Sequence, residues 1–121
     1  MPLVPKLWDR TGGALLMRAG AAGRLTTVGR RSGQERTVQC GFLGRADGSV
    51  LVGSAADRQW PQNLLVAGCC TFEANGLPAR RYTAAVLEGA ERTAAIAEFR
   101  AARGDRAAAM FSGLVFELRP T

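Results

Sequence analysis

The stretch LTTVGRRSGQERTV, residues 25–38, decides the fold of this chain. β-Branched residues dominate both of its ends, as in strands, and glycines, a serine and arginines stand between them. This pattern predicts two strands joined by a turn. Gly29 and Gly33 let the backbone bend, and the arginines supply forked donors that suit phosphate or carboxylate oxygens. The turn is therefore a candidate clamp for an anionic group, built from Arg30, Arg31 and Arg36.

Turn signals divide the rest of the chain into further elements. Asp47-Gly48 and Asn75-Gly76 are hairpin signals, while Pro61 and Gly68 suit the first turn and the end of a short helix. The expected strands are residues 24–28, 36–43, 50–54, 69–74, 77–87 and 110–118, with helices at 60–67 and 91–103. Six strands in hairpin order with short helices predict a mainly β (α+β) fold, an antiparallel barrel with peripheral helices.

Length and composition predict one globular domain, residues 1–121, which can bury about two-thirds of its unfolded surface. The net charge of +6 attracts anions in general. Nucleic acid is not expected as a partner, because the few aromatic residues do not alternate with the arginines as base stacking requires. The sequence has no histidine, which excludes a histidine-dependent triad and a histidine-ligated zinc site.

Residues 1–22 are expected to form a helical arm of the same domain. Apolar residues recur at roughly helical spacing over residues 3–19, with a break at Gly12-Gly13. The arm covers a barrel end, packs on a partner or lies on a membrane surface, and its few cations favour packing. The three cysteines lack C-x-x-C spacing, so neither a disulfide framework nor a metal site is expected. With no membrane span or signal pattern, the sequence predicts a cytoplasmic protein, peripheral membrane contact remaining open.

Four motifs, taken in order, resemble the deazaflavin-dependent nitroreductase family. They are residues 25–33, residues 36–38, the Trp-x-x-Asn motif within residues 60–64, and Arg81-Tyr82. The resemblance extends over residues 24–92 and more weakly into the last strand. It implies a six-stranded split β-barrel, FMN-binding-like, that uses coenzyme F420.

The resemblance also implies which residues form the site. Turn residues match positions that hold the coenzyme's phosphate and glutamate tail, residues at the end of the third strand match positions beside the deazaflavin ring, and helix residues match positions that flank the pocket. The expected cofactor-binding residues are Arg30, Arg31, Ser32, Gly33, Arg36, Val52, Gly53, Ser54, Trp60 and Asn63. Ser54 is also the expected catalytic residue, as a proton donor, with bulk water as the alternative. On spacing alone, Trp60 suits core packing as well as ring stacking.

The activity implied by the resemblance is hydride transfer from reduced deazaflavin to a small electron-poor acceptor such as a quinone, nitro compound or enone. The coenzyme carries the hydride, so a homodimeric reductase of this kind needs position and a dry pocket more than acid–base residues. Two alternatives remain open. The loop at residues 55–59 looks shortened relative to the family, which favours a non-catalytic module that carries a lipid or coenzyme, and a phosphate clamp also serves an FMN-dependent enzyme.

Overall fold

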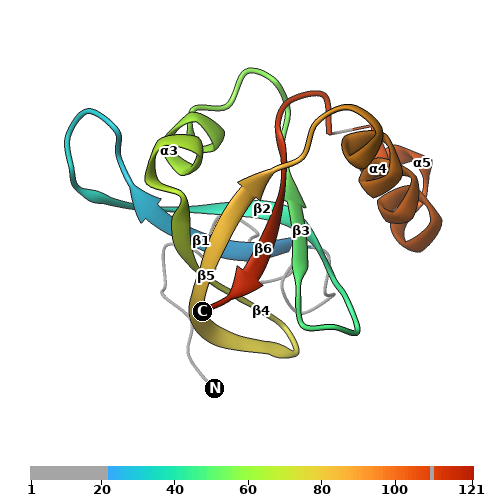
Figure 1. The fold of residues 1–121 in the computed structure, drawn as a ribbon, viewed down its shortest axis with the longest axis horizontal. Coiled ribbons are helices and arrows are strands. Elements are labelled where there is room, and N and C mark those ends of the chain that lie inside the picture. The colour runs from blue at the N-terminus through green and yellow to red at the C-terminus, as the bar shows by residue number, and fades with distance from the viewer. Residues whose placement is uncertain (1–21, 110) are drawn as a thin grey trace.

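The computed structural model describes residues 22–109 and 111–121, which form a closed barrel (Figure 1). Its strands are β1 (Ala22–Val28), β2 (Glu35–Gly44), β3 (Val50–Gly53), β4 (Cys69–Ala74), β5 (Leu77–Val86) and β6 (Val115–Pro120). They follow the order β1-β2-β3-β6-β5-β4, β4 pairs with β1, and every pair is antiparallel. The predicted six-stranded antiparallel barrel is confirmed.

Helices lie at two ends of this barrel. α3 (Trp60–Ala67) lies beside the β1–β2 turn, while α4 (Gly89–Arg103) and α5 (Asp105–Ala108) lie together at the opposite side (Figure 1). Within the described ranges, no helix combines the length and the apolar character that crossing a membrane requires. The turn and α3, which carry most of the predicted site residues, are therefore neighbours in space.

Glycines end the elements where the turn signals predicted. Gly48 and Gly76 have φ of 89° and 86°, in the region that favours glycine, and each forms the tip of a hairpin. Gly68 has φ of 71° and donates its amide to the Leu64 carbonyl oxygen at 2.8 Å, which closes the C-terminus of α3. The short helix and both hairpin turns are confirmed.

β3 is buried on both faces, which explains its unbroken apolar sequence. Val50 and Val52 point into the barrel interior, where they belong to the main core cluster. Leu51 points to the outside and packs in a second cluster with Phe99 of α4 and Phe111. α4 therefore covers the outer face of this strand, and the chain after α5 must pass over the same strand before β6 begins.

The structure corrects several predicted bounds. The last strand was expected from residue 110 and begins only at Val115, because Phe111 turns away to pack on Phe99, with ring centroids 4.3 Å apart. α4 begins at Gly89, two residues before its predicted start, and α5 was not predicted. The expected arm lies outside the described residues except for Ala22, which pairs with Gly41 as the first residue of β1. The remaining predicted bounds agree to within a residue or two.

Two of the cysteines lie in the barrel interior. Cys40 and Cys70 are each 6% exposed, whereas Cys69 on the other face of β4 is partly exposed. Burial raises the pKa of the Cys40 thiol, with a smaller contribution from nearby Cys70, and burial raises the pKa of Cys70 to about 12. Because only the thiolate reacts, we expect these two thiols to be unreactive at neutral pH.

We expect Cys70 to react with a thiol reagent at pH 8 roughly a thousandfold more slowly in the native protein than in urea, since its thiolate fraction falls by that factor. A Cys69→Ser variant removes the partly exposed thiol and makes the slow reaction easy to follow. A rapid reaction of both remaining thiols would contradict the buried placement.

The raised pKa values of the two thiols also make stability fall as pH rises above the ordinary thiol pKa of 9.0, because the unfolded chain then releases protons that the folded chain keeps.

Candidate functional site

The β1–β2 turn folds back on itself through its backbone amides. The Gly29 amide donates to the Gln34 carbonyl oxygen at 2.8 Å, and the Gly33 amide donates to the Gly29 carbonyl oxygen at 2.9 Å. Gly33 has φ of 72°, which a glycine adopts without strain. The Gln34 amide donates to Ser32 Oγ at 3.2 Å. These three amides are used within the turn, so its arginine side chains are the main candidates for binding an anion.

Arg30 fastens this turn to α3. Its backbone amide and its Nη1 both donate to Asn63 Oδ1, at 3.1 and 2.7 Å, and its Nη2 donates to Gln59 Oε1 at 2.9 Å. Asn63 is only 7% exposed. The structure therefore brings together two of the predicted site residues, Arg30 and Asn63, but directs them at each other.

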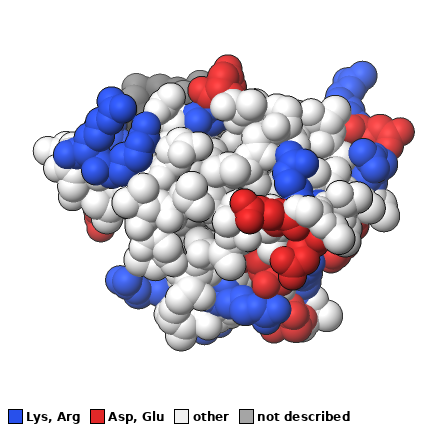
Figure 2. Space-filling model, turned by 45° about the horizontal axis from the view of Figure 1, so that its top comes forward, with Lys and Arg blue, Asp and Glu red and all other residues white. Residues whose placement is uncertain are grey.

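All three arginines of the turn are exposed, and Arg31 and Arg36 are the two that the hydrogen bonds to α3 leave unused. Arg36 Nε lies 3.2 Å from the position that a Cβ on Gly29 would take, so the Arg36 side chain runs along the turn over that glycine. Figure 2 shows basic side chains gathered at the left of the molecule, at the end where Figure 1 places the turn. These two cations, with the Ser32 hydroxyl between them in sequence, remain candidates for anion binding.

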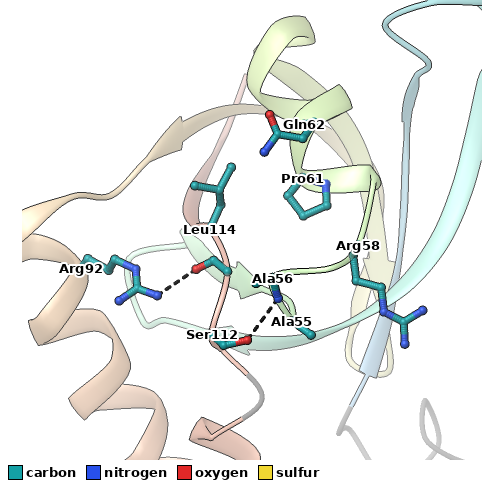
Figure 3. A pocket seen from close by; sticks show the side chains of 9 residues that line it. Ala55, Ala56, Arg58, Pro61, Gln62, Arg92, Ser112 and Leu114 are labelled. Atoms are coloured by element: carbon teal, nitrogen blue, oxygen red, sulfur yellow. Dashed lines mark hydrogen bonds between the residues drawn. The ribbon is translucent and has the colours of Figure 1, made fainter.

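A cleft of about 360 Å³ lies along a neighbouring face of α3. It is lined by Ala55, Ala56, Arg58, Pro61, Gln62, Arg92, Ser112, Gly113 and Leu114, and none of these described lining residues is acidic (Figure 3). Pro61 and Leu114 face the hollow from opposite sides, while the guanidinium of Arg58 points outward. The cleft therefore combines apolar walls with polar groups at its edges, as small-molecule sites commonly do.

The segment after α5 forms one wall of this cleft and is held firmly. Arg92 Nη2 donates to the carbonyl oxygens of Phe111 and Gly113 at 3.2 and 2.8 Å. The Ala56 amide donates to Ser112 Oγ at 3.1 Å, and the Gly113 amide donates to the Ser54 carbonyl oxygen at 2.9 Å. A Cβ on Gly113 would lie 2.9 Å from the Ala55 carbonyl oxygen, so only glycine permits this close approach.

The predicted residues at the end of β3 are covered by the same segment. Val52 is fully buried in the barrel interior, and the Phe111 ring lies within about 3.0 Å of where a Cβ on Gly53 would stand. The Ser54 hydroxyl donates to the Ala55 carbonyl oxygen at 2.9 Å, and Ser54 is 8% exposed. Of these three residues, Gly53 lies beneath the Phe111 ring, and none of them lines the cleft.

Trp60 is part of the main core. It is 6% exposed, and its ring centroid lies 6.3 Å from that of Phe116 in β6. The predicted i,i+3 relation places Trp60 and Asn63 in the same buried region of α3, with the indole toward Phe116 and the amide toward Arg30. Of the two roles that the spacing allowed for Trp60, its surroundings are those of core packing.

The cleft also contains residues that sequence reasoning missed. Arg92 lies in the first part of α4, and Ser112 lies in a segment that was expected to be a strand. The only local signal of this close contact in the sequence was Gly113, since a glycine inside a run of β formers often marks a close backbone approach.

In the part of the chain that the structure describes, no group of three or more His, Cys, Asp or Glu could hold a metal ion.

No protein-family model matches this sequence, and no curated protein matches it. Solved structures do resemble it. An F420-H2 dependent reductase (FDR-A) superposes with a TM-score of 0.66 and 20% identity, over 82% of this chain and 94% of that one. HutZ, the heme storage protein from Vibrio cholerae, superposes with a TM-score of 0.67 and 16% identity, over 100% of this chain and 92% of that one. A candidate pyridoxamine 5'-phosphate oxidase from Listeria innocua superposes with a TM-score of 0.58 and 14% identity, over 95% of this chain and 94% of that one.

At these identities the likeness is one of fold. The chain has a six-stranded split β-barrel with short helices, the architecture of pyridoxamine oxidase-like proteins. This barrel serves proteins with different ligands, coenzyme F420 in the reductase and heme in HutZ. The choice of ligand for this chain therefore rests on its own side chains.

Proposed function

We propose that this protein is a coenzyme F420-dependent oxidoreductase, which reduces a quinone, nitro compound or enone. The observation that carries the proposal is the placement of two exposed arginines, Arg31 and Arg36, on a turn that is fastened to α3, the helix that also forms a wall of the cleft. The anionic tail of the coenzyme at the turn and its flat ring in the cleft would then both lie beside α3. The similarity in fold to an F420-H2 dependent reductase supports the same assignment.

The side chains present fit such a coenzyme. Arg31, Ser32 and Arg36 offer guanidinium and hydroxyl groups for phosphate and carboxylate oxygens. The cleft, at about 360 Å³, lies at the small end of the range for ligand pockets, so it suits a ring and leaves the tail outside. Pro61 and Leu114 provide apolar walls for that ring.

When bound, the reduced deazaflavin supplies the hydride, and the protein supplies position and a dry surface. The Ser54 hydroxyl is committed to the Ala55 carbonyl oxygen, so we propose that water at the cleft mouth, rather than Ser54, delivers any proton to the acceptor. Gln62 and Ser112 line the cleft and can orient an acceptor by hydrogen bonding. We place this enzyme in the cytoplasm, as a homodimer in which the exposed Leu65 and Val66 of α3 are covered.

Two measurements test the proposal. Coenzyme F420 is titrated against the protein by fluorescence, and oxidation of F420H2 by menadione is followed in the coenzyme's absorbance band. Micromolar binding together with turnover supports the reductase. Binding of FMN in place of F420 indicates the flavin alternative, and absence of binding to both removes the proposal.

A second candidate function is favoured by Phe111. Its ring covers Gly53, so this chain fills with its own side chain the space above the end of β3. A protein that carries the coenzyme without using it has no need of that space. Binding of F420 with unchanged absorbance in the presence of every acceptor class would identify such a non-catalytic module.

Heme, the ligand named for HutZ, fits this chain less well. The sequence has no histidine, the most frequent axial ligand. Among the described residues, Cys40, Cys70 and Tyr82, which could also ligate heme iron, are buried in the barrel core, and only Cys69 is partly exposed. Heme is therefore a useful negative control in the titrations.

We expect Arg31→Ala and Arg36→Ala each to weaken F420 binding by roughly ten- to a hundredfold, because each removes a charge-assisted hydrogen bond to the tail. The salt dependence of binding should also become shallower. The control is Arg106→Ala, which removes the same charge from exposed α5, at the side of the barrel opposite to the turn. Equal losses in all three variants would show a general charge effect and contradict the assigned contacts.

A further inference from the structure

Arg30 differs from the other arginines of the turn because it is hydrogen-bonded to α3. The three hydrogen bonds that it makes to described residues all go to neutral amide oxygens, those of Gln59 and Asn63. The forked guanidinium reaches both side chains at once, with Nη1 on Asn63 and Nη2 on Gln59. This geometry uses the shape of the group, a planar fork, more than its charge.

The acceptor on α3 depends on this arginine. Asn63 is 7% exposed, and both hydrogen bonds that its Oδ1 accepts from described residues come from Arg30. A buried carbonyl oxygen without a donor is costly, so removal of either partner destabilises the other. Arg30 and Asn63 therefore act as one unit, which we call the Arg30 clasp together with Gln59.

The clasp attaches the start of α3 to the β1–β2 turn, at a helix end that has no side-chain cap. α3 begins after Gln59, which makes no side-chain capping hydrogen bond, and its first turn contains no acidic residue. With only eight residues, α3 has little stability of its own. The clasp is thus the main polar attachment between the start of this helix and the barrel in the described residues.

The clasp and the cleft lie on adjacent faces of the same helical turn. Gln59, the N-cap residue, and Asn63 are four residues apart and share one face, and Pro61 and Gln62 of the same first turn line the cleft. A shift of the first turn of α3 away from β1 therefore also moves a cleft wall. The hydrogen bonds between Arg30 and Asn63 therefore help to set the distance between the turn and the cleft.

We infer that Arg30 is a positioning residue, which fixes the anion-binding turn relative to the cleft and leaves contact with the anion to Arg31 and Arg36. The inference rests on the proposed function in taking F420 as the ligand. It differs from the sequence-based expectation, in which Arg30 itself holds the coenzyme tail. The two roles predict opposite results when Asn63 is changed.

The experiment uses Asn63→Ala, with coenzyme F420 as the probe. If Arg30 positions the turn, loss of its acceptor weakens F420 binding by about tenfold, since the two halves of the site are no longer aligned. If Arg30 is a direct ligand, the same change frees its guanidinium, and binding stays equal or becomes tighter, which overturns the inference. Arg30→Lys, which keeps the charge and loses the fork, should weaken binding as much as Asn63→Ala does.

Hydrogen exchange of the unliganded protein gives an independent readout. Amides of residues 29–33 should exchange about tenfold faster in Asn63→Ala than in the wild type, because the turn is released. Gln59→Ala, at an exposed position, keeps the buried amide and should give a smaller effect in the same direction. If the wild type binds no F420, the proposed function fails, and unchanged exchange in both variants overturns the clasp separately.

Discussion

Replacing Phe111 by alanine is expected to lower the free energy of unfolding by about 3–5 kcal/mol. The ring is 5% exposed, its centroid lies 4.3 Å from that of Phe99, and it covers the backbone of Gly53. Alanine at this position leaves a cavity between α4 and β3, and the hydrogen bonds of Arg92 to the neighbouring carbonyl groups limit how far the segment can collapse into it. Urea denaturation followed by circular dichroism measures the loss.

The functional effect of removing this ring is expected to be a gain. Under the proposed function, Phe111 occupies the space above Gly53, where the family resemblance places the deazaflavin ring. A smaller side chain lets the coenzyme approach β3 more closely, so oxidation of F420H2 by menadione should become faster. Because 3–5 kcal/mol is a large share of a domain's stability, typically about 5–15 kcal/mol, Phe111→Leu serves as the milder variant.

Phe99→Leu is the matched control for Phe111→Leu. It makes a similar loss of volume in the same cluster under α4 and leaves the ring above Gly53 in place. Faster turnover in Phe111→Leu alone supports the idea that the coenzyme can approach Gly53 at the end of β3. An equal change in both variants, or none in either, contradicts it and shows that the coenzyme does not reach Gly53.

The barrel could be predicted because its signals are local. Asn75-Gly76 and Asp47-Gly48 favour tight turns by their own backbone preferences, and Gly68 ends α3 in the same way. Alternation within each strand then sets which side chains face the core, as the burial of every second residue in β4 illustrates. Hairpin order leaves few ways to arrange such strands other than an antiparallel barrel.

The segment at residues 111–114 could not be predicted for the opposite reason. Its sequence suits a strand, but Phe111 packs on Phe99, and Arg92 binds two of its carbonyl groups. These partners lie about one helix earlier in the chain, so no window of sequence around the segment contains them. Tertiary contacts therefore override the local β preference, and they create a wall of the cleft in doing so.

The sequence indicated which elements carry the candidate site, but not the directions in which their side chains point. Spacing placed Trp60 and Asn63 on one side of a helix, and a turn with three arginines was expected next to it. Spacing does not tell which face of the helix meets the core, so the sequence could not show that Asn63 binds Arg30. That Arg30 binds α3 whereas Arg31 and Arg36 do not becomes visible only when the turn and α3 are seen together.

Replacing Trp60 by alanine is expected to cost about 3–5 kcal/mol of unfolding free energy, because the indole fills the barrel interior. It is 6% exposed and packs against Phe116, and such aromatic pairs contribute about 0.5–1.5 kcal/mol beyond burial. Trp60→Phe keeps most of this packing and should lose much less. Thermal or urea unfolding of the two variants gives the comparison.

Fluorescence separates this packing role from a role in stacking on a coenzyme. The chain has two tryptophans, so the difference between the emission of the wild type and that of Trp60→Phe reports Trp60 alone. A buried indole should emit at short wavelength, and Trp60→Phe should bind F420 nearly as tightly as the wild type. A Trp60→Phe variant with full stability but strongly weakened F420 binding would instead place the indole against the coenzyme, because packing inside the barrel predicts a loss of stability before any loss of affinity.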